Sequence, residues 1–155
     1  MRYALVIVDG FSLLHRDATL KALLDRQPAL ARHQLVQRAE RVAAALAPKL
    51  TVVFDGHRGL NDAFVGGPTE VIFSSTHQSA DACIERMVRV QPDPSKVLVI
   101  TSDRTERESV HAAGGDTMSC GDFLVLPDPV RTRSSRTGSA KTASPHRLGD
   151  YFPKT

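Results

Sequence analysis

Residues 3–16 read YALVIVDGFSLLHR, and this stretch decides the fold that the sequence predicts. Its first half is a continuous apolar run that stops at Asp9. Two later stretches repeat the pattern, LTVVFDG at residues 50–56 and KVLVITSD at residues 96–103. Continuous apolar runs, as opposed to alternating ones, are typical of parallel strands that helices cover on both faces. We therefore expect three buried parallel strands, each ending in an aspartate.

The segments between these runs predict helices and two weaker strands. A long helical stretch between the first two runs has apolar residues at helical spacing: Leu35, Ala39, Val42 and Leu46. Residues 79–90 (SADACIERMVRV) and 103–115 (DRTERESVHAAGG) predict two more helices, the latter ending at a glycine pair suited to a left-handed cap. EVIFSS at residues 70–75 and DTMSC at residues 116–120 predict the weaker strands. The order β-α-β-β-α-β-α-β favours a three-layer α/β/α, Rossmann-like domain with a mainly parallel sheet.

Composition and charge divide the chain into three parts. Residues 1–127 form the predicted domain and are close to neutral, whereas residues 128–155 carry six Lys/Arg and two Asp. We expect residues 128–144 to be a disordered basic linker, because they have almost no large apolar residues. Residues 145–155 regain apolar bulk in a short C-terminal segment: Leu148, Tyr151 and Phe152. This segment either docks into a protein partner or folds back onto its own domain.

Several classes of protein are disfavoured. At 155 residues the chain suits a single domain, and it has no apolar run long enough to span a membrane and no signal-peptide pattern. Cys83 and Cys120 are isolated, which favours reduced thiols and a cytoplasmic protein without a zinc site. No GxGxxG or P-loop motif is present, which disfavours nucleotide-binding functions of those kinds. Residues 57–68 (HRGLNDAFVGGP) are expected to form a mobile loop.

Acidic residues gather at one predicted edge. An aspartate ends each of the three apolar runs: Asp9, Asp55 and Asp103. The carboxyl ends of parallel strands share one edge of a sheet, so the fold would bring these side chains together. Asp81 lies at the start of the helix at residues 79–90, and Glu85 follows one turn later on the same face. Crowded carboxylates repel one another unless a cation neutralises them, and Mg²⁺ or Mn²⁺ suits that role.

Each acid also has a purely structural interpretation. The first two strand-end aspartates precede glycines, as in ordinary turns. Asp103 and Glu106 have the spacing of a capping box. Asp81 and Glu85 suit helix positions where the dipole or an ion pair favours a negative charge. Taken together, the acids fit one shared site better than four separate explanations.

Four stretches, in this order and spacing, resemble the YacP-like branch of the NYN domains. They are VIVDGFSLLHR, LTVVFDG, SADACIERMV and, at residues 97–123, VLVITSDRTERESVHAAGGDTMSCGDF. The resemblance covers roughly residues 3–126. These domains are PIN-like metal-dependent ribonucleases. The resemblance implies a PIN-like fold and a Mg²⁺- or Mn²⁺-dependent endoribonuclease. Its substrate would be single-stranded RNA, free or associated with the ribosome, cleaved by a metal-activated water.

The resemblance also implies roles for individual residues. Asp9 matches the first-strand acid of the family, and Asp81 and Asp103 match its (T/S)AD and TSD motifs. These three are the expected catalytic residues and metal ligands, with Asp55 and Glu85 helping to hold the metal directly or through water. The expected substrate contacts are Ser12, His57, Arg58, Ser102, Arg104 and Arg107.

One position departs from the family pattern. The family usually has Asn two residues after the glycine, as in DGYN, and this chain has Ser12. Together with the basic tail, this motivates an alternative function, an RNA- or ribosome-binding adaptor of the same fold with little catalysis. A further alternative is a PIN-like structure-specific DNA nuclease, because the opening stretch also resembles those domains.

Overall fold

The structure is a computed structural model that describes residues 1–56, 69–74 and 78–130. Within these residues one sheet is built from β1 (Leu5–Asp9), β2 (Lys49–Phe54), β3 (Thr69–Phe73), β4 (Val97–Ile100) and β5 (Asp116–Met118). The helices are α1 (Gly10–Arg16), α2 (Ala18–Arg26), α3 (Pro28–Ala43), α4 (Ala80–Arg89), α5 (Arg104–Ala112) and α6 (Cys120–Leu124), with a 3₁₀ turn η1 (Pro94–Lys96). The predicted order of strands and of the helices between them is confirmed, except that the first helical stretch forms three helices and that α6 follows the last strand.

The sheet is parallel throughout, in the order β3-β2-β1-β4-β5. β1 is its centre and pairs with β2 on one side and β4 on the other. The strand order reverses between β1 and β4, and ligands of open α/β sheets bind at the carboxyl ends of the strands beside such a point. Asp9 is the last residue of β1, so the fold places it there.

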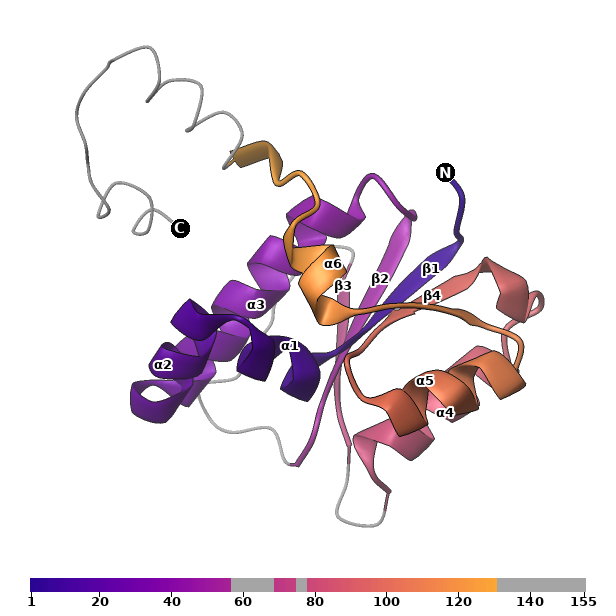
Figure 1. The fold of residues 1–155 in the computed structure, drawn as a ribbon, viewed down its shortest axis with the longest axis horizontal. Coiled ribbons are helices and arrows are strands. Elements are labelled where there is room, and N and C mark those ends of the chain that lie inside the picture. The colour runs from indigo at the N-terminus through magenta and orange to yellow at the C-terminus, as the bar shows by residue number, and fades with distance from the viewer. Residues whose placement is uncertain (57–68, 75–77, 131–155) are drawn as a thin grey trace.

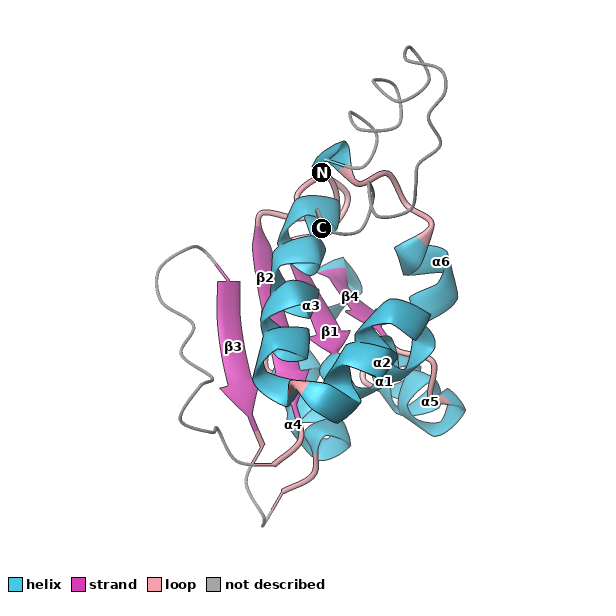
Figure 2. Ribbon diagram, turned by 90° about the vertical axis from the view of Figure 1, so that its left-hand side faces the viewer, coloured by secondary structure: helices cyan, strands magenta, loops and turns pink. Residues whose placement is uncertain are grey.

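Helices cover both faces of the sheet, as the continuous apolar runs predict. Val6 and Val8 contribute to one core, against α1, α2, α3 and α6. Leu5 and Ile7 contribute to the other, against α4 and α5. This alternation follows from the two-residue period of a strand. Figure 1 shows the two helical layers on opposite sides of the strands, and Figure 2 shows β3 at the edge of the sheet. The three-layer α/β/α architecture is confirmed.

The long helical stretch before β2 is divided into α1, α2 and α3. Asp17 ends α1 and caps α2, because its Oδ1 accepts a hydrogen bond from the Leu20 N–H at 3.0 Å. Pro28 opens α3, a position where the missing N–H of proline costs nothing. Asp17 also binds Arg38 of α3, with Nη1 and Oδ2 2.6 Å apart. The cap and the proline therefore fold the stretch back on itself against the sheet.

Several predictions fall partly or wholly outside the described residues. The loop at residues 57–68 and the apolar segment at residues 145–155 lie outside them, as does the linker beyond Val130. The first linker residue, Asp128, is buried and accepts two hydrogen bonds from Arg41 of α3. Both cysteines are buried and free, and none of the described helices is long and apolar enough to cross a membrane.

Gly10 is required for the close approach of α1 to β2. A Cβ added at Gly10 would lie 2.4 Å from Phe54 Cδ1 and 2.9 Å from the carbonyl oxygen of Val53. Gly10→Ala is therefore expected to lower the free energy of unfolding by about 1–3 kcal/mol through overpacking. Urea unfolding measures the change.

Gly121→Ala provides the control for this substitution. The nearest atom to a Cβ at Gly121 is Nη2 of Arg16, at 2.9 Å, and that side chain is flexible enough to move aside. We expect it to change stability much less than Gly10→Ala. Equal unfolding midpoints for the two variants would contradict the steric role of Gly10.

Candidate metal centre

Three acids from three separate elements meet at the carboxyl edge of the sheet. Asp9 ends β1, Asp81 lies in the first turn of α4, and Glu106 lies in the first turn of α5. Each offers one carboxylate oxygen, and these oxygens all lie within 4.8 Å of one another. Asp9 and Glu106 are buried, whereas Asp81 is exposed. The group therefore has a buried floor and one side open to solvent.

Asp9 is held by hydrogen bonds from two hydroxyls and one backbone amide. Its Oδ2 accepts from Ser12 Oγ at 2.8 Å and from Thr101 Oγ1 at 2.9 Å, and the two hydroxyl oxygens lie 3.3 Å apart. Its Oδ1 accepts from the Ser12 N–H at 3.4 Å, which makes Asp9 the N-cap of α1. The hydroxyl of Ser12, which replaces the usual Asn, thus contacts the carboxylate of the central strand directly.

Glu106 is the unusual member of the group because it is almost fully buried, at 2% exposure, in a largely polar helix. Thr101 Oγ1 lies 3.4 Å from its Oε1, and among the described residues Oε2 has no hydrogen-bond partner. Burial, the negative charge of Asp9 and the approach of the Asp81 and Asp9 carboxyls raise the pKa of Glu106 to about 10. Carboxylate oxygens in this arrangement are the ligands that hard divalent cations prefer, so the residues present fit such a cation.

Asp55 lies outside the three-acid group and joins the surrounding elements. Its Oδ1 accepts hydrogen bonds from Ser74 Oγ at 3.2 Å and from the Ala80 N–H at 3.1 Å. These bonds tie the end of β2 to the end of β3 and to the start of α4. Because Ala80 directly precedes Asp81, Asp55 helps to place Asp81 at the edge.

Asp103 caps α5 and is not brought into the group. Its Oδ1 accepts from the N–H groups of Thr105, at 2.9 Å, and Glu106, at 3.2 Å. The reciprocal half of a capping box is absent, because the Asp103 N–H donates to Thr101 Oγ1 at 3.2 Å. Glu106 is thereby left to face the other acids. Asp103 as a metal ligand stays a prediction.

The remaining predicted residues surround this centre or lie away from it. Glu85 forms an ion pair with Arg89, one turn further along α4. Ser102 Oγ accepts from the Cys120 N–H at 3.3 Å, which links the edge to α6. Arg104 is exposed at the start of α5, and Arg107 donates to Thr117 Oγ1 at 3.4 Å. His57 and Arg58 lie outside the described residues.

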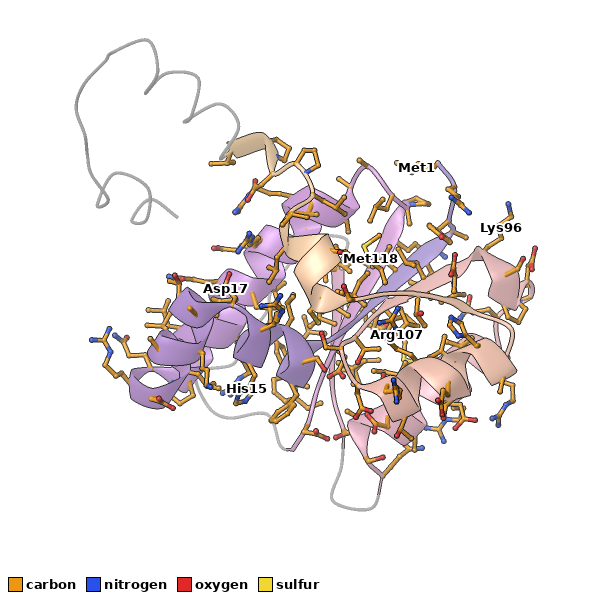
Figure 3. The ribbon with its side chains drawn as sticks, in the orientation of Figure 1. Met1, His15, Asp17, Lys96, Arg107 and Met118 are labelled. Carbon is orange, nitrogen blue, oxygen red and sulfur yellow. The ribbon has the colours of Figure 1, made fainter. Side chains whose placement is uncertain are left out.

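Two residues near the edge were not singled out as site residues from the sequence. The spacing of Glu106 from Asp103 indicates half of a capping box, and only the burial of Glu106 shows otherwise. Burial raises the pKa of the Cys120 thiol. The charge of Asp9 raises this pKa further, and the charge of Arg16, which is exposed at the end of α1, lowers it. Arg16 and Asp9 therefore both lie near the same thiol, so the Arg16 guanidinium is on the flank of the acidic group. Figure 3 shows His15 on α1 and Arg107 on α5 on either side of the end of β1.

Glu106→Gln tests the burial of this carboxyl in the metal-free protein. Between its ordinary pKa of 4.5 and about 10, folded Glu106 holds a proton that the unfolded chain lacks. Folding stability attributable to Glu106 therefore falls as pH rises through this window. We expect wild type to lose stability relative to Glu106→Gln as pH rises from 5 to 8, by roughly 1 kcal/mol per pH unit at most. Urea unfolding in chelator at several pH values measures this, and parallel curves would contradict it.

Comparison with known proteins finds a family, a relative and solved structures that are similar to this chain. The model of the YacP-like NYN domain matches residues 6–151. The uncharacterized protein YacP of Bacillus subtilis (strain 168) is 27% identical over 135 residues, which cover 85% of this chain and 79% of that protein. A crystal structure of a mutant of Rae1 (YacP) from Bacillus subtilis has a TM-score of 0.70 at 25% identity, over 90% of this chain and 84% of that one. Another Rae1 (YacP) crystal structure has a TM-score of 0.68 at 25% identity, over 88% and 83%. The chain therefore belongs to the YacP-like NYN domain family and has its PIN-like fold.

Proposed function

We propose that this protein is a Mg²⁺- or Mn²⁺-dependent endoribonuclease that cleaves single-stranded RNA. The observation that supports it is the convergence of Asp9, Asp81 and Glu106 at the carboxyl edge of the sheet. Three acids with oxygens within 4.8 Å of one another are electrostatically costly unless a cation is bound. Membership of the NYN family makes phosphodiester hydrolysis the reaction class that fits this cation site.

Each acid has a distinct part in holding the cation. Asp9 and Glu106 supply buried oxygens from below, and Asp81 supplies an exposed one from the start of α4. When bound, the cation would activate a water and stabilise negative charge on the attacked phosphate. Thr101 and Ser12 fix the orientation of the Asp9 carboxylate through their hydroxyls. The open side beside Asp81 is where the phosphate would enter.

Arginine side chains along the edge would offset the negative charge of the acids, which would otherwise repel an incoming RNA. Arg104 is exposed at the start of α5, two residues before Glu106. Arg16 lies on the other flank, at the end of α1. Exposed arginines suit phosphate groups, and RNA binding through them should weaken as salt rises. The buried free thiols suit a reducing compartment, so we place the activity in the cytoplasm, on RNA that is free or ribosome-associated.

Neutralising any member of the group should abolish most of the cleavage. For Asp9→Asn, Asp81→Asn and Glu106→Gln we expect kcat/KM on single-stranded RNA with Mn²⁺ to fall at least about 100-fold, because the cation loses a charged ligand. Chelation of the cation should have the same effect on wild type. Product formation from a labelled oligoribonucleotide measures both.

The matched control is Glu108→Gln, which removes an exposed carboxylate from the same helix. Residues 106 and 108 lie about 200° apart around α5, so this change is directed away from the site. It should leave cleavage unchanged. RNA binding without cleavage by wild type, with or without divalent cations, would instead identify an adaptor. Cleavage of branched DNA in preference to RNA would identify a DNA nuclease.

Asp103→Asn separates capping from metal binding. Asparagine can keep the N-cap hydrogen bonds of α5 but removes the negative charge. Because Oδ1 of Asp103 already caps Thr105 and Glu106, we expect the variant to keep Mn²⁺ affinity within about 10-fold of wild type. Calorimetric titration with Mn²⁺ measures it. A loss as large as that of Asp81→Asn would make Asp103 a direct ligand.

A further inference from the structure

An exposed aromatic pair stands on α1 next to the acidic group. The Phe11 side chain is 56% exposed, although it belongs to the first turn of a helix whose other face is buried. Its ring contacts the His15 ring, with centroids 4.2 Å apart and planes inclined by 40°. The two residues are four apart, so they lie one above the other on the same side of the helix.

Phe11 lies two residues after Asp9 of the acidic group along the chain. Phe11 lies between Gly10 and Ser12, and the hydroxyl of Ser12 contacts the Asp9 carboxylate at 2.8 Å. Phe11 is therefore within one helical turn of the cap formed by Asp9. Figure 3 shows His15 on α1, the helix that begins directly after β1 ends.

An exposed phenyl ring at this place calls for an explanation. Among the described residues, the other large apolar side chains that are exposed are aliphatic: Met1, Leu30, Val90, Val125 and Val130. Single exposed apolar residues are ordinary on a protein surface, and those five need no ligand. Phe11 differs because its exposed ring is supported by a second ring and stands beside a charged site.

We propose that the Phe11–His15 pair is a stacking subsite for one nucleobase of the RNA whose phosphate lies at Asp9, Asp81 and Glu106. This inference rests on the proposed function and adds a base-binding element to it. Proteins that bind single-stranded nucleic acid commonly stack bases on aromatic side chains, and this contact tolerates any sequence because every base has a flat π face. The pair would hold the chain in register without selecting a base.

The surroundings of the pair favour a nucleotide over an apolar ligand. Arg16 follows His15 directly and is exposed at the end of α1. Its guanidinium lies against α6, where Gly121 leaves room for it: an added Cβ would be 2.9 Å from Nη2. The end of β1 and the helix that follows it thus carry a flat apolar surface, an arginine and a group of acids suited to a cation. Single-stranded RNA has the matching alternation of flat bases and negative phosphates.

Phe11→Leu tests the subsite because it keeps an apolar side chain but removes the aromatic face. We expect the full chain to bind a short oligoribonucleotide about 5- to 100-fold more weakly, the range for loss of one stacked base. Fluorescence anisotropy in chelator gives the Kd, and cleavage with Mn²⁺ gives KM. An abasic oligonucleotide of the same length and charge should bind wild type and Phe11→Leu equally.

Two further variants make the comparison specific. Phe11→Tyr keeps the ring and should restore binding, whereas Leu30→Ala removes an exposed apolar side chain from α3 and should change nothing. Both Phe11 variants should unfold at nearly the wild-type temperature, since the side chain is exposed. Equal Kd and KM for wild type and Phe11→Leu would overturn the subsite, as would an equal loss of affinity for the abasic chain.

The outcomes also separate the subsite from the proposed function. If Asp81→Asn cleaves RNA as well as wild type, the metal site is misassigned, and a base-dependent loss in Phe11→Leu still supports stacking. If Asp81→Asn is inactive but Phe11→Leu matches wild type, the nuclease stands and the subsite falls. If wild type binds no RNA in chelator or with Mn²⁺, both are overturned.

Discussion

Two carboxyl groups, those of Asp9 and Glu106, are buried side by side, and the rest of the site depends on this arrangement. Burial and like charge both disfavour ionising them together, which is why the pKa of Glu106 is raised. The Thr101 hydroxyl, within 2.9 Å of Asp9 and 3.4 Å of Glu106, lies between them. In the metal-free protein a proton relieves the repulsion. A divalent cation would relieve it in the proposed enzyme. The repulsion between the carboxylates would therefore favour binding of the cation.

The acids at this edge have different tasks, although their sequence contexts look alike. Asp55 and Asp103 each use an oxygen to hold the backbone N–H at the start of a helix, α4 in one case and α5 in the other. These hydrogen bonds help to bring Asp81 and Glu106, in the first turns of those helices, to the end of β1. Asp55 and Asp103 therefore help to determine where the proposed metal ligands lie. The structural interpretation holds for Asp55 and Asp103, whereas Asp9 belongs to the acidic group proposed as the metal site.

The short helix α1 connects the two halves of the proposed mechanism. Its first turn carries Ser12, which orients Asp9, and Phe11, which faces solvent beside it. Its close fit against β2 through Gly10 keeps this turn in place. A displacement of α1 would move the carboxylate and the aromatic pair together. The same helix would thus help to position both a phosphate of the RNA and the neighbouring base.

The sequence by itself determined the strands, their parallel pairing and the edge at which Asp9 would lie, because continuous apolar runs ending in aspartates permit few other arrangements. It also predicted that Asp81 would start a helix near that edge. Only the tertiary structure decided that Glu106 joins Asp9 and Asp81 while Asp103 caps α5. Both residues have the spacing of a capping box, and local spacing does not reveal which way a long side chain turns. That choice depends on Thr101, which takes the Asp103 N–H and leaves the Glu106 carboxyl facing the buried end of β1.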